Sequence, residues 1–144
     1  VTHGHISAWD VSGVTDMSYL ITTYCGTGGA ITESTFNEDI SEWDVSAGTT
    51  MHTMFRGASL FNQSLSGWDV SAVTSMQAMF MQALSFNQPL SGWDTSTVTT
   101  MYMMFFQATL FNQVLCWDTT GKDNGGYMFL HSSGSANGNC IKCK

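Results

Sequence analysis

The sequence predicts an α/β solenoid of the leucine-rich-repeat type, with about five units of about 25 residues, each forming one short parallel strand and one short helix. Three observations predict it. The dipeptide Trp-Asp recurs along the chain, apolar residues follow it at constant offsets, and the apolar spacing within a unit changes from that of a strand to that of a helix. Because such a unit cannot bury its own apolar face, successive units are expected to stack.

All the tryptophans of the chain occupy one position of the repeat. Each is followed by aspartate, and the five are Trp9, Trp43, Trp68, Trp93 and Trp117, at spacings of 34, 25, 25 and 24 residues. The long first interval predicts a Gly-rich loop insertion at about 24–35, and the short last unit predicts a degenerate terminal repeat at 114–131. We expect the repeat solenoid to cover 1–131, followed by a Gly/Ser/Asn-rich, Cys-containing tail at 132–144.

The third unit shows the elements that each unit is expected to form. Trp68 and Val70 are two residues apart, which places both on one side of a short strand and turns Asp69 to solvent. The next apolar residues have the i, i+3, i+4, i+7 spacing of one helix face, and they are Met76, Met79, Phe80 and Ala83. Thr74 precedes them as a candidate N-cap. Parallel strands are therefore expected on one face of the stack and helices on the other.

The whole pattern resembles the DUF285 repeat family, which is related to BspA-type leucine-rich repeats. The third unit carries it from Phe61-Asn62-Gln63 through Trp68-Asp69-Val70-Ser71 to Met79-Phe80 and Ala83, and the resemblance covers about residues 6–131. Such repeats are known from surface lipoproteins of bacteria and mycoplasmas and from secreted or membrane-linked proteins of marine microalgae. The resemblance implies a leucine-rich-repeat-like solenoid on an exported protein, and it implies no enzymatic activity and no catalytic residues.

Composition excludes several classes of partner. Charged residues make up 10% of the chain, and 4 Lys and Arg against 11 Asp and Glu give a formal net charge of −7. A domain this poor in basic residues cannot neutralise many phosphates, so neither nucleic acid nor anionic lipid is expected to bind. No run of 18 apolar residues occurs, so no membrane span is predicted. The chain begins at Val1, which we interpret as a processed end or a piece of a longer protein.

The cysteines indicate an oxidising compartment. The even count and the clustering near the C-terminus are typical of disulfides, and the candidates are Cys25, Cys116, Cys140 and Cys143. Three connectivities are possible, with Cys116 and one tail cysteine as the favoured pair. Cys140-x-x-Cys143 is also compatible with half of a zinc site or a redox pair, and Cys25 with a free thiol or a bond to a partner.

The aspartates after the tryptophans form a column of carboxylates, namely Asp10, Asp44, Asp69, Asp94 and Asp118. One hypothesis is a stripe that binds cations or a basic partner. The favoured interpretation is structural: each Asp bonds nearby backbone or hydroxyl groups, such as those of Ser71, and fixes a turn.

A column of asparagines comprises Asn37, Asn62, Asn87 and Asn112, and it is expected to satisfy buried backbone groups in turns. Asn62-Gln63-Ser64 is also a glycosylation sequon, and a buried Asn would not be modified. Most of the 10 methionines fall at core positions, so packing is favoured over metal binding by their thioethers.

No catalytic, cofactor-binding or metal site is predicted. The histidines are His3, His5, His52 and His131; none recurs in register, and none has an evident Ser, Cys or acidic partner in the sequence. His3-x-His5 is a weak metal motif. An enzyme would require non-repeating polar residues that converge in one pocket, and the candidates for that are Glu33, Glu38, Glu42, His52 and Arg56.

The sequence therefore predicts a non-catalytic protein-interaction or scaffold module of an exported or surface protein, with a partner protein of unknown identity and no cofactor. One alternative is an accessory structural subunit docked on a larger membrane complex in an organelle lumen, such as the thylakoid lumen. Another is a cation or carbohydrate binder that uses the Asp, Ser and Thr columns. The strand face, the Asp column and the insertion are the surfaces expected to bind a protein partner.

Overall fold

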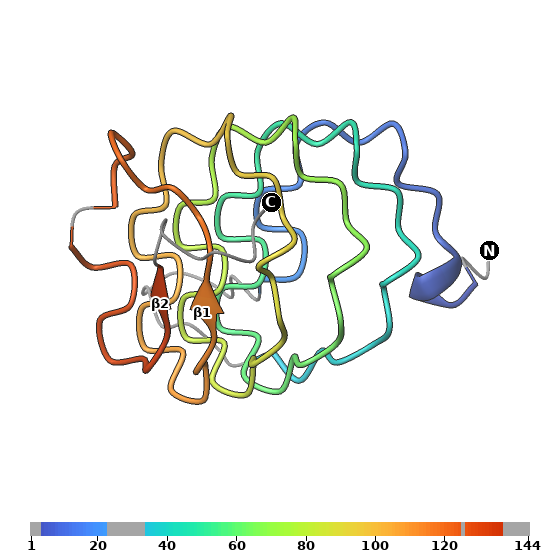
Figure 1. The fold of residues 1–144 in the computed structure, drawn as a ribbon. Helices are drawn as coiled ribbons and strands as arrows, with labels where there is room; N and C mark the ends of the chain where they lie inside the picture. Colours follow the sequence, from blue (N-terminus) through green and yellow to red (C-terminus); the bar gives the residue numbers. More distant parts are fainter. Residues whose placement is uncertain (1–3, 23–33, 125, 137–144) are drawn as a thin grey trace, which may run out of the picture.

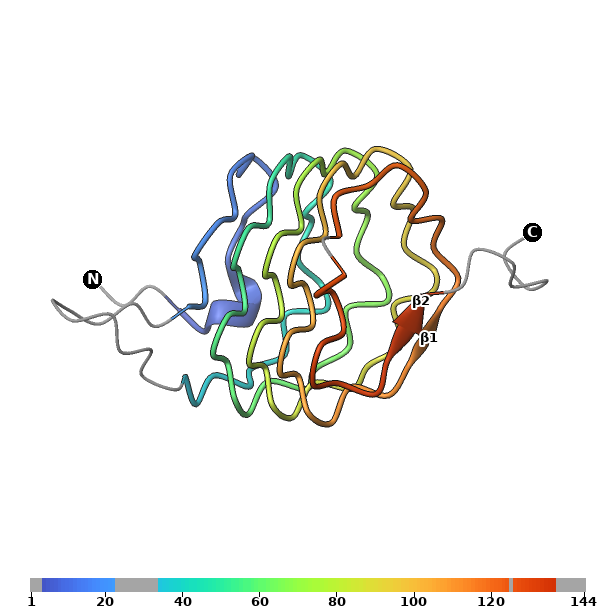
Figure 2. The same ribbon diagram turned by 90° about the vertical axis from the view of Figure 1, so that its left-hand side faces the viewer.

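The computed structural model describes residues 4–22, 34–124 and 126–136, which wind through a series of similar coils stacked along one axis (Figure 1). In these ranges, regular secondary structure is limited to the 3-10 helix η1 (Ile6–Ala8) and the strands β1 (Val114–Leu115) and β2 (Ser135–Ala136). The two strands pair in parallel, with Val114 opposite Ser135 and Leu115 opposite Ala136. The first and last coils lie at opposite ends of the stack (Figure 2).

The prediction of a strand-plus-helix solenoid of the leucine-rich-repeat type is wrong. The described residues contain no α-helix, and consecutive turns stand where the helix of the third unit was predicted. Met79 N–H donates to Met76 O at 3.2 Å and Ala83 N–H donates to Phe80 O at 3.1 Å, which are three-residue steps that close tight turns. Ala78 and Gln82 have φ angles of +52° and +59°, and a right-handed helix excludes such values. The apolar spacing arises because successive turns return a side chain to the core every third or fourth residue.

The repeated strand is also absent. Among the described residues, parallel pairing outside β1 and β2 is limited to single bridges that join consecutive coils through Asp16, Thr50, Ser75, Thr100 and Asp123. At the predicted strand around Trp68, the chain turns instead. Asp69 accepts a hydrogen bond from Ser71 N–H at 3.0 Å, and Val73 N–H donates to Val70 O at 2.9 Å. Both bonds fold the backbone back within three residues, so no extended segment follows the tryptophan.

Backbone hydrogen bonds between coils hold the stack together. Along the turns of the second coil, Met51 N–H donates to Ser75 O at 3.0 Å and Phe55 N–H donates to Met79 O at 2.9 Å. The second coil also accepts hydrogen bonds from the first coil. Met17 N–H, for example, donates to Thr50 O at 3.0 Å. We call this series of bonds the turn ladder. Within these turn segments the N–H groups of the ladder face the next coil and its carbonyls face the preceding coil, whereas at the adjoining corner the direction is reversed, as where Thr74 N–H donates to Thr49 O at 2.8 Å.

The core consists of side-chain columns that run along the stack. Phe55, Phe80 and Phe105 are fully buried, and their near-parallel rings stack at centroid distances of 5.3 and 5.5 Å. A second phenylalanine column lies beside the first, with Phe80 and Phe86 stacked at 4.1 Å. The methionines of the turn segments also belong to the core and are fully buried; they are Met17, Met51, Met54, Met76, Met79, Met101 and Met104. Within the described ranges, no helix is long and apolar enough to cross a bilayer.

Candidate functional site

Each aspartate of the Trp-Asp column closes a turn with the residue two positions later. Its Oδ1 accepts the backbone N–H of a serine or threonine at 2.9–3.0 Å, and the acceptors are Asp10, Asp44, Asp69, Asp94 and Asp118. At Asp44 the Ser46 hydroxyl donates to the same oxygen at 2.7 Å. The side chains are exposed. The column therefore shapes the corner after each tryptophan.

These hydrogen bonds also set the charge state of the carboxyls. The bond from the Ser46 hydroxyl, followed by the bond from the Ser46 backbone N–H, holds the pKa of Asp44 below its ordinary value. Charges on Asp10 and Asp69 oppose this effect, but only weakly. The same kind of bond lowers the pKa of the other turn-closing aspartates, which are Asp10, Asp16, Asp39, Asp69, Asp94 and Asp118. In the described part of the chain, no three His, Cys, Asp or Glu side chains gather closely enough to hold a metal ion.

We expect the free energy of unfolding to fall as the pH is lowered through about 4 and below. A folded-state pKa below the unfolded value contributes stability above the unfolded pKa, and this contribution is lost as pH falls through the folded pKa. Chemical denaturation followed by tryptophan fluorescence between neutral pH and about pH 2 measures the loss. In the triple variant Asp44→Asn, Asp69→Asn, Asp94→Asn the amide oxygens still accept the turn bonds but do not titrate, so the decline should be shallower. An equally steep decline in that variant would contradict the assignment.

The tryptophan side chains bond each coil to the one before it. Trp43 Nε1–H donates to Ile6 O at 3.0 Å and Trp68 Nε1–H donates to Ile40 O at 3.1 Å. Trp93 and Trp117 do the same with Leu65 O and Leu90 O, at 2.9 and 3.2 Å. These four rings are buried, whereas Trp9 on the first coil is 44% exposed. The indole column therefore ends at an open surface on the N-terminal end of the stack.

The asparagine column forms a side-chain ladder at another corner. Asn37 Oδ1 accepts from Asn62 N–H, and Asn62 Oδ1 accepts from Asn87 N–H, both at 2.9 Å. The ladder continues to Asn112 with the same distance. The glutamine that follows the donor asparagine also bonds the preceding coil. For example, Gln63 Nε2 donates to Asn37 O at 3.0 Å. Asn62 itself is exposed, in contrast to the buried environment expected for it, but its Oδ1 is engaged in this ladder.

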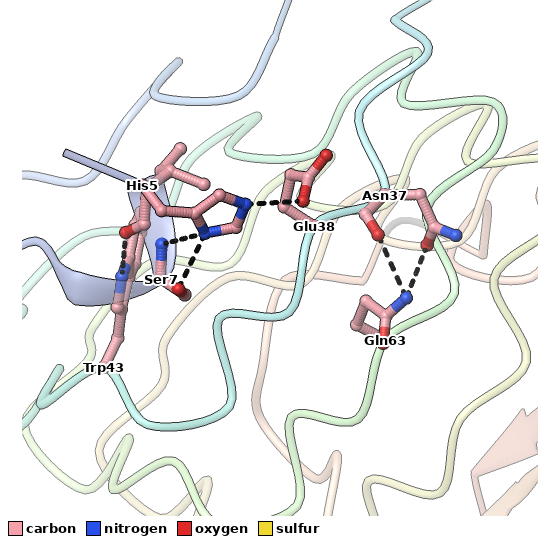
Figure 3. A network of polar contacts seen from close by, with 7 residues as sticks. His5, Ser7, Asn37, Glu38, Trp43 and Gln63 are labelled. Carbon is pink, nitrogen blue, oxygen red and sulfur yellow. Dashed lines mark hydrogen bonds and ion pairs between the residues drawn. The ribbon is translucent and has the colours of Figure 1, made fainter.

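The structure places His5 in a polar network that sequence reasoning missed (Figure 3). His5 Nδ1 lies 2.7 Å from Ser7 Oγ, and His5 Nε2 lies 3.1 Å from Glu38 Oε2. These are the residue types of a hydrolase triad, but His5 and Glu38 are exposed, and Nδ1 also accepts Ser7 N–H as the N-cap of η1. The network therefore joins the first coil to the second next to the Trp43–Ile6 bond.

The other histidines do not assemble a site with the acidic candidates. His52 Nε2 lies 3.1 Å from the Tyr19 hydroxyl, and their rings meet edge to face at 5.3 Å. His131 makes an edge-to-face contact with Phe106 at 6.0 Å. Of the remaining candidates, His3 and Glu33 lie outside the described residues, and Arg56 and Glu42 do not bond to any histidine within them.

Lys122 caps carbonyl groups of the preceding coil, which was not predicted. Its Nζ donates to Val98 O at 2.8 Å and to Thr95 O at 2.9 Å. The lysine lies in the terminal unit, where the repeat pattern is lost, so no register comparison could identify it. Cys116 is disulfide-bonded. Cys25, Cys140 and Cys143 lie outside the described residues, so the connectivity stays a prediction.

One apolar surface lies on the turns of the last two coils. We call it the turn surface and define it by Tyr102, Phe106, Leu110 and Tyr127. Leu110 is 61% exposed, Tyr127 is also exposed, and Tyr102 and Phe106 are half-buried. The rings of Tyr102 and Tyr127 meet edge to face at 5.9 Å. The turn segments 101–110 and 126–132 contain no Asp, Glu, Lys or Arg, so no charge within these segments interrupts the surface.

Comparison with known proteins identifies one family. A family model described as "Mycoplasma protein of unknown function, DUF285" matches residues 2–26 and 27–141, which is well over half of the chain. No curated protein and no solved structure matches the chain.

Proposed function

The chain belongs to the DUF285 family, and from that premise we propose that it is a non-catalytic interaction module that binds a partner protein through the turn surface. The observation that carries the proposal is the exposure of Leu110 and Tyr127 on turn segments that also carry Tyr102 and Phe106 and that contain no charged residue. Aromatic residues surrounded by few charges are typical of the centre of a protein–protein interface.

The positions of the polar candidates also support a non-catalytic role. The Asp, Asn and Trp columns each use their side-chain atoms to bond backbone groups of the stack. Among the described residues, the grouping of His5, Ser7 and Glu38 resembles catalytic machinery in residue type, but His5 and Glu38 are exposed and His5 caps η1. A low-dielectric, water-excluding site is what gives such groups catalytic strength.

We place the module outside the cytosol, on an exported protein or in an organelle lumen. The disulfide bond of Cys116 supports this, because disulfides persist mainly in oxidising compartments. A turn surface that docks on a larger assembly suits either location.

A photo-crosslinking amino acid in place of Leu110 tests the proposal in extract from the native source. We expect a defined cross-linked protein from position 110 and none from the exposed Thr74. Excess unlabelled wild-type protein should abolish the cross-link, and the Leu110→Asp variant should not, because a carboxylate is costly to bury in an apolar interface.

Leu60 provides the matched control for this competition. It lies two repeats before Leu110 and is 51% exposed, but it is not part of the turn surface. The Leu60→Asp variant should therefore compete as well as the wild type. Competition by Leu110→Asp that equals that of the wild type, or the absence of any cross-link at position 110, would refute the proposal.

A further inference from the structure

The turn ladder leaves hydrogen-bond acceptors unpaired at the N-terminal end of the stack. In the second coil, Thr50 O, His52 O and Met54 O accept N–H groups of the first coil at 3.0–3.1 Å. The equivalent carbonyls of the first coil belong to Asp16, Ser18 and Leu20, and they accept no hydrogen bond from the described residues. We call these three carbonyls the acceptor edge. They face away from the second coil because every carbonyl of the ladder faces the preceding coil.

The C-terminal end presents the complementary groups. Phe105 N–H donates to Met128 O at 2.8 Å and Gln107 N–H donates to Leu130 O at 2.9 Å. The next N–H groups in the ladder, those of Phe129 and His131, have no acceptor in residues 4–22, 34–124 or 126–136. We call these two the donor edge. Along residues 16–22 the N-terminal end of the stack thus offers acceptors, and along residues 129–131 the C-terminal end offers donors.

Side chains at both ends leave apolar surface uncovered. The outer face of the first coil has a depression lined by Ala8, Trp9, Asp10, Val11, Val14 and Leu20. Leu20 is 44% exposed, although its counterparts Met54 and Met79 in the inner coils are fully buried. The last coil has a depression of its own, with Met128, Phe129 and Leu130 in its wall. Both depressions adjoin the unpaired edges, so a partner that pairs an edge also covers apolar surface.

We propose that the N-terminal end of the stack docks on the C-terminal end of a second copy of this chain, so that the turn ladder continues from one copy into the next. Inside the stack, Phe55 N–H donates to Met79 O at 2.9 Å and Gly57 N–H donates to Met81 O at 2.9 Å. In the same register across the junction, Phe129 N–H of one copy donates to Leu20 O of the other. His131 N–H then donates to Thr22 O, the next carbonyl along from the acceptor edge, which also accepts no hydrogen bond from the described residues. The junction therefore repeats the bonding that joins the coils within one chain.

The polarity of the edges decides the orientation of the two copies. Two acceptor edges cannot bond each other, and their carbonyl dipoles repel, so pairing of two N-terminal ends is disfavoured. Head-to-tail contact matches donors with acceptors, and it builds an open chain of copies or, where the rotation between copies closes, a ring. Trp117, in the last coil, is 2% exposed, so the tryptophan column is already covered at the C-terminal end of the stack. The junction is therefore confined to the turn segments.

Sedimentation velocity over a range of concentrations tests the proposal with two variants that each block one end. Leu20→Lys places a charge at the acceptor edge, and Leu130→Lys places a charge in the depression of the last coil. Both side chains are solvent-exposed, so both variants should fold, and circular dichroism verifies this. The wild type should grow in mass with concentration, and each variant alone should stay monomeric. An equimolar mixture should sediment at twice the monomer mass and no higher, because one free N-terminal end then meets one free C-terminal end.

Three results would overturn the proposal: a wild type that stays monomeric at millimolar concentration, a Leu130→Lys variant that still associates alone, or a mixture that remains monomeric. The second of these would indicate a contact between identical ends. Leu110→Asp should associate as the wild type does, because Leu110 belongs to neither edge and lines neither depression. If position 110 gives no cross-link but the wild type self-associates, only the proposed function is rejected. If position 110 cross-links a partner but the wild type stays monomeric, only the junction is rejected.

Discussion

Replacement of Phe80 by alanine is expected to lower the free energy of unfolding by about 3–5 kcal/mol. The Phe80 ring is fully buried, and it stacks on Phe55 at 5.3 Å, on Phe105 at 5.5 Å and on Phe86 at 4.1 Å. Alanine would leave a cavity shared by three coils. The coils cannot close it, because the turn ladder fixes their separation through backbone bonds such as Ala78 N–H to Tyr102 O at 2.9 Å.

Urea denaturation followed by tryptophan fluorescence and by circular dichroism measures this change. Leu60→Ala is the control, since its exposed side chain contributes little to the core and its truncation should change stability by no more than about 0.5 kcal/mol. A loss below about 2 kcal/mol in Phe80→Ala would show that neighbouring coils collapse onto the site and that the ladder is more compliant than its hydrogen bonds indicate.

Replacement of Trp93 by phenylalanine is expected to destabilise the fold by about 2–3 kcal/mol. The smaller ring removes the 2.9 Å bond from Trp93 Nε1–H to Leu65 O and part of the stacking on Trp117 at 6.2 Å. Leu65 O keeps a second donor, Trp68 N–H at 3.2 Å, so this carbonyl is not left fully unsatisfied. The hydrogen bond therefore accounts for about 1 kcal/mol and the lost ring volume for the remainder.

Trp9→Phe provides the comparison, because the same change is made in the same column on a side chain that is 44% exposed. We expect it to cost less than half as much in the same denaturation experiment. Equal losses in the two variants would mean that burial does not determine the contribution of the tryptophan column.

The spacing of the tryptophans predicted the interval between bonded residues but not the backbone conformation. Asn62 N–H bonds the side chain of Asn37, 25 residues earlier, and Trp43 and Trp68 are separated by the same number. The helix prediction failed because a chain of turns and an α-helix both return side chains to the core every third or fourth residue. The left-handed backbone of Ala78 and Gln82 distinguishes the two, and neither residue type favours that conformation by itself.

The structural use of the aspartates could be anticipated from their serine or threonine partners two residues later, as in Asp44 and Ser46. The contact of His5 with Glu38 could not. Glu38 follows Asn37 at the position that glutamine takes in later units, and only the stacking of the first two coils brings it to His5. These coils are separated by the longer first interval, so sequence spacing does not give the register between them.

The turn ladder also determines how a molecule of this kind can change in length. Every coil bonds partners about one period away, so closing each additional coil costs about the same loop entropy, which grows only slowly with the number of residues enclosed. Each coil in return gains one set of ladder bonds and one further layer of phenylalanine and methionine. Duplication or loss of a whole unit therefore changes the free energy of unfolding by a similar amount for each unit, and it leaves the geometry of the remaining coils unchanged.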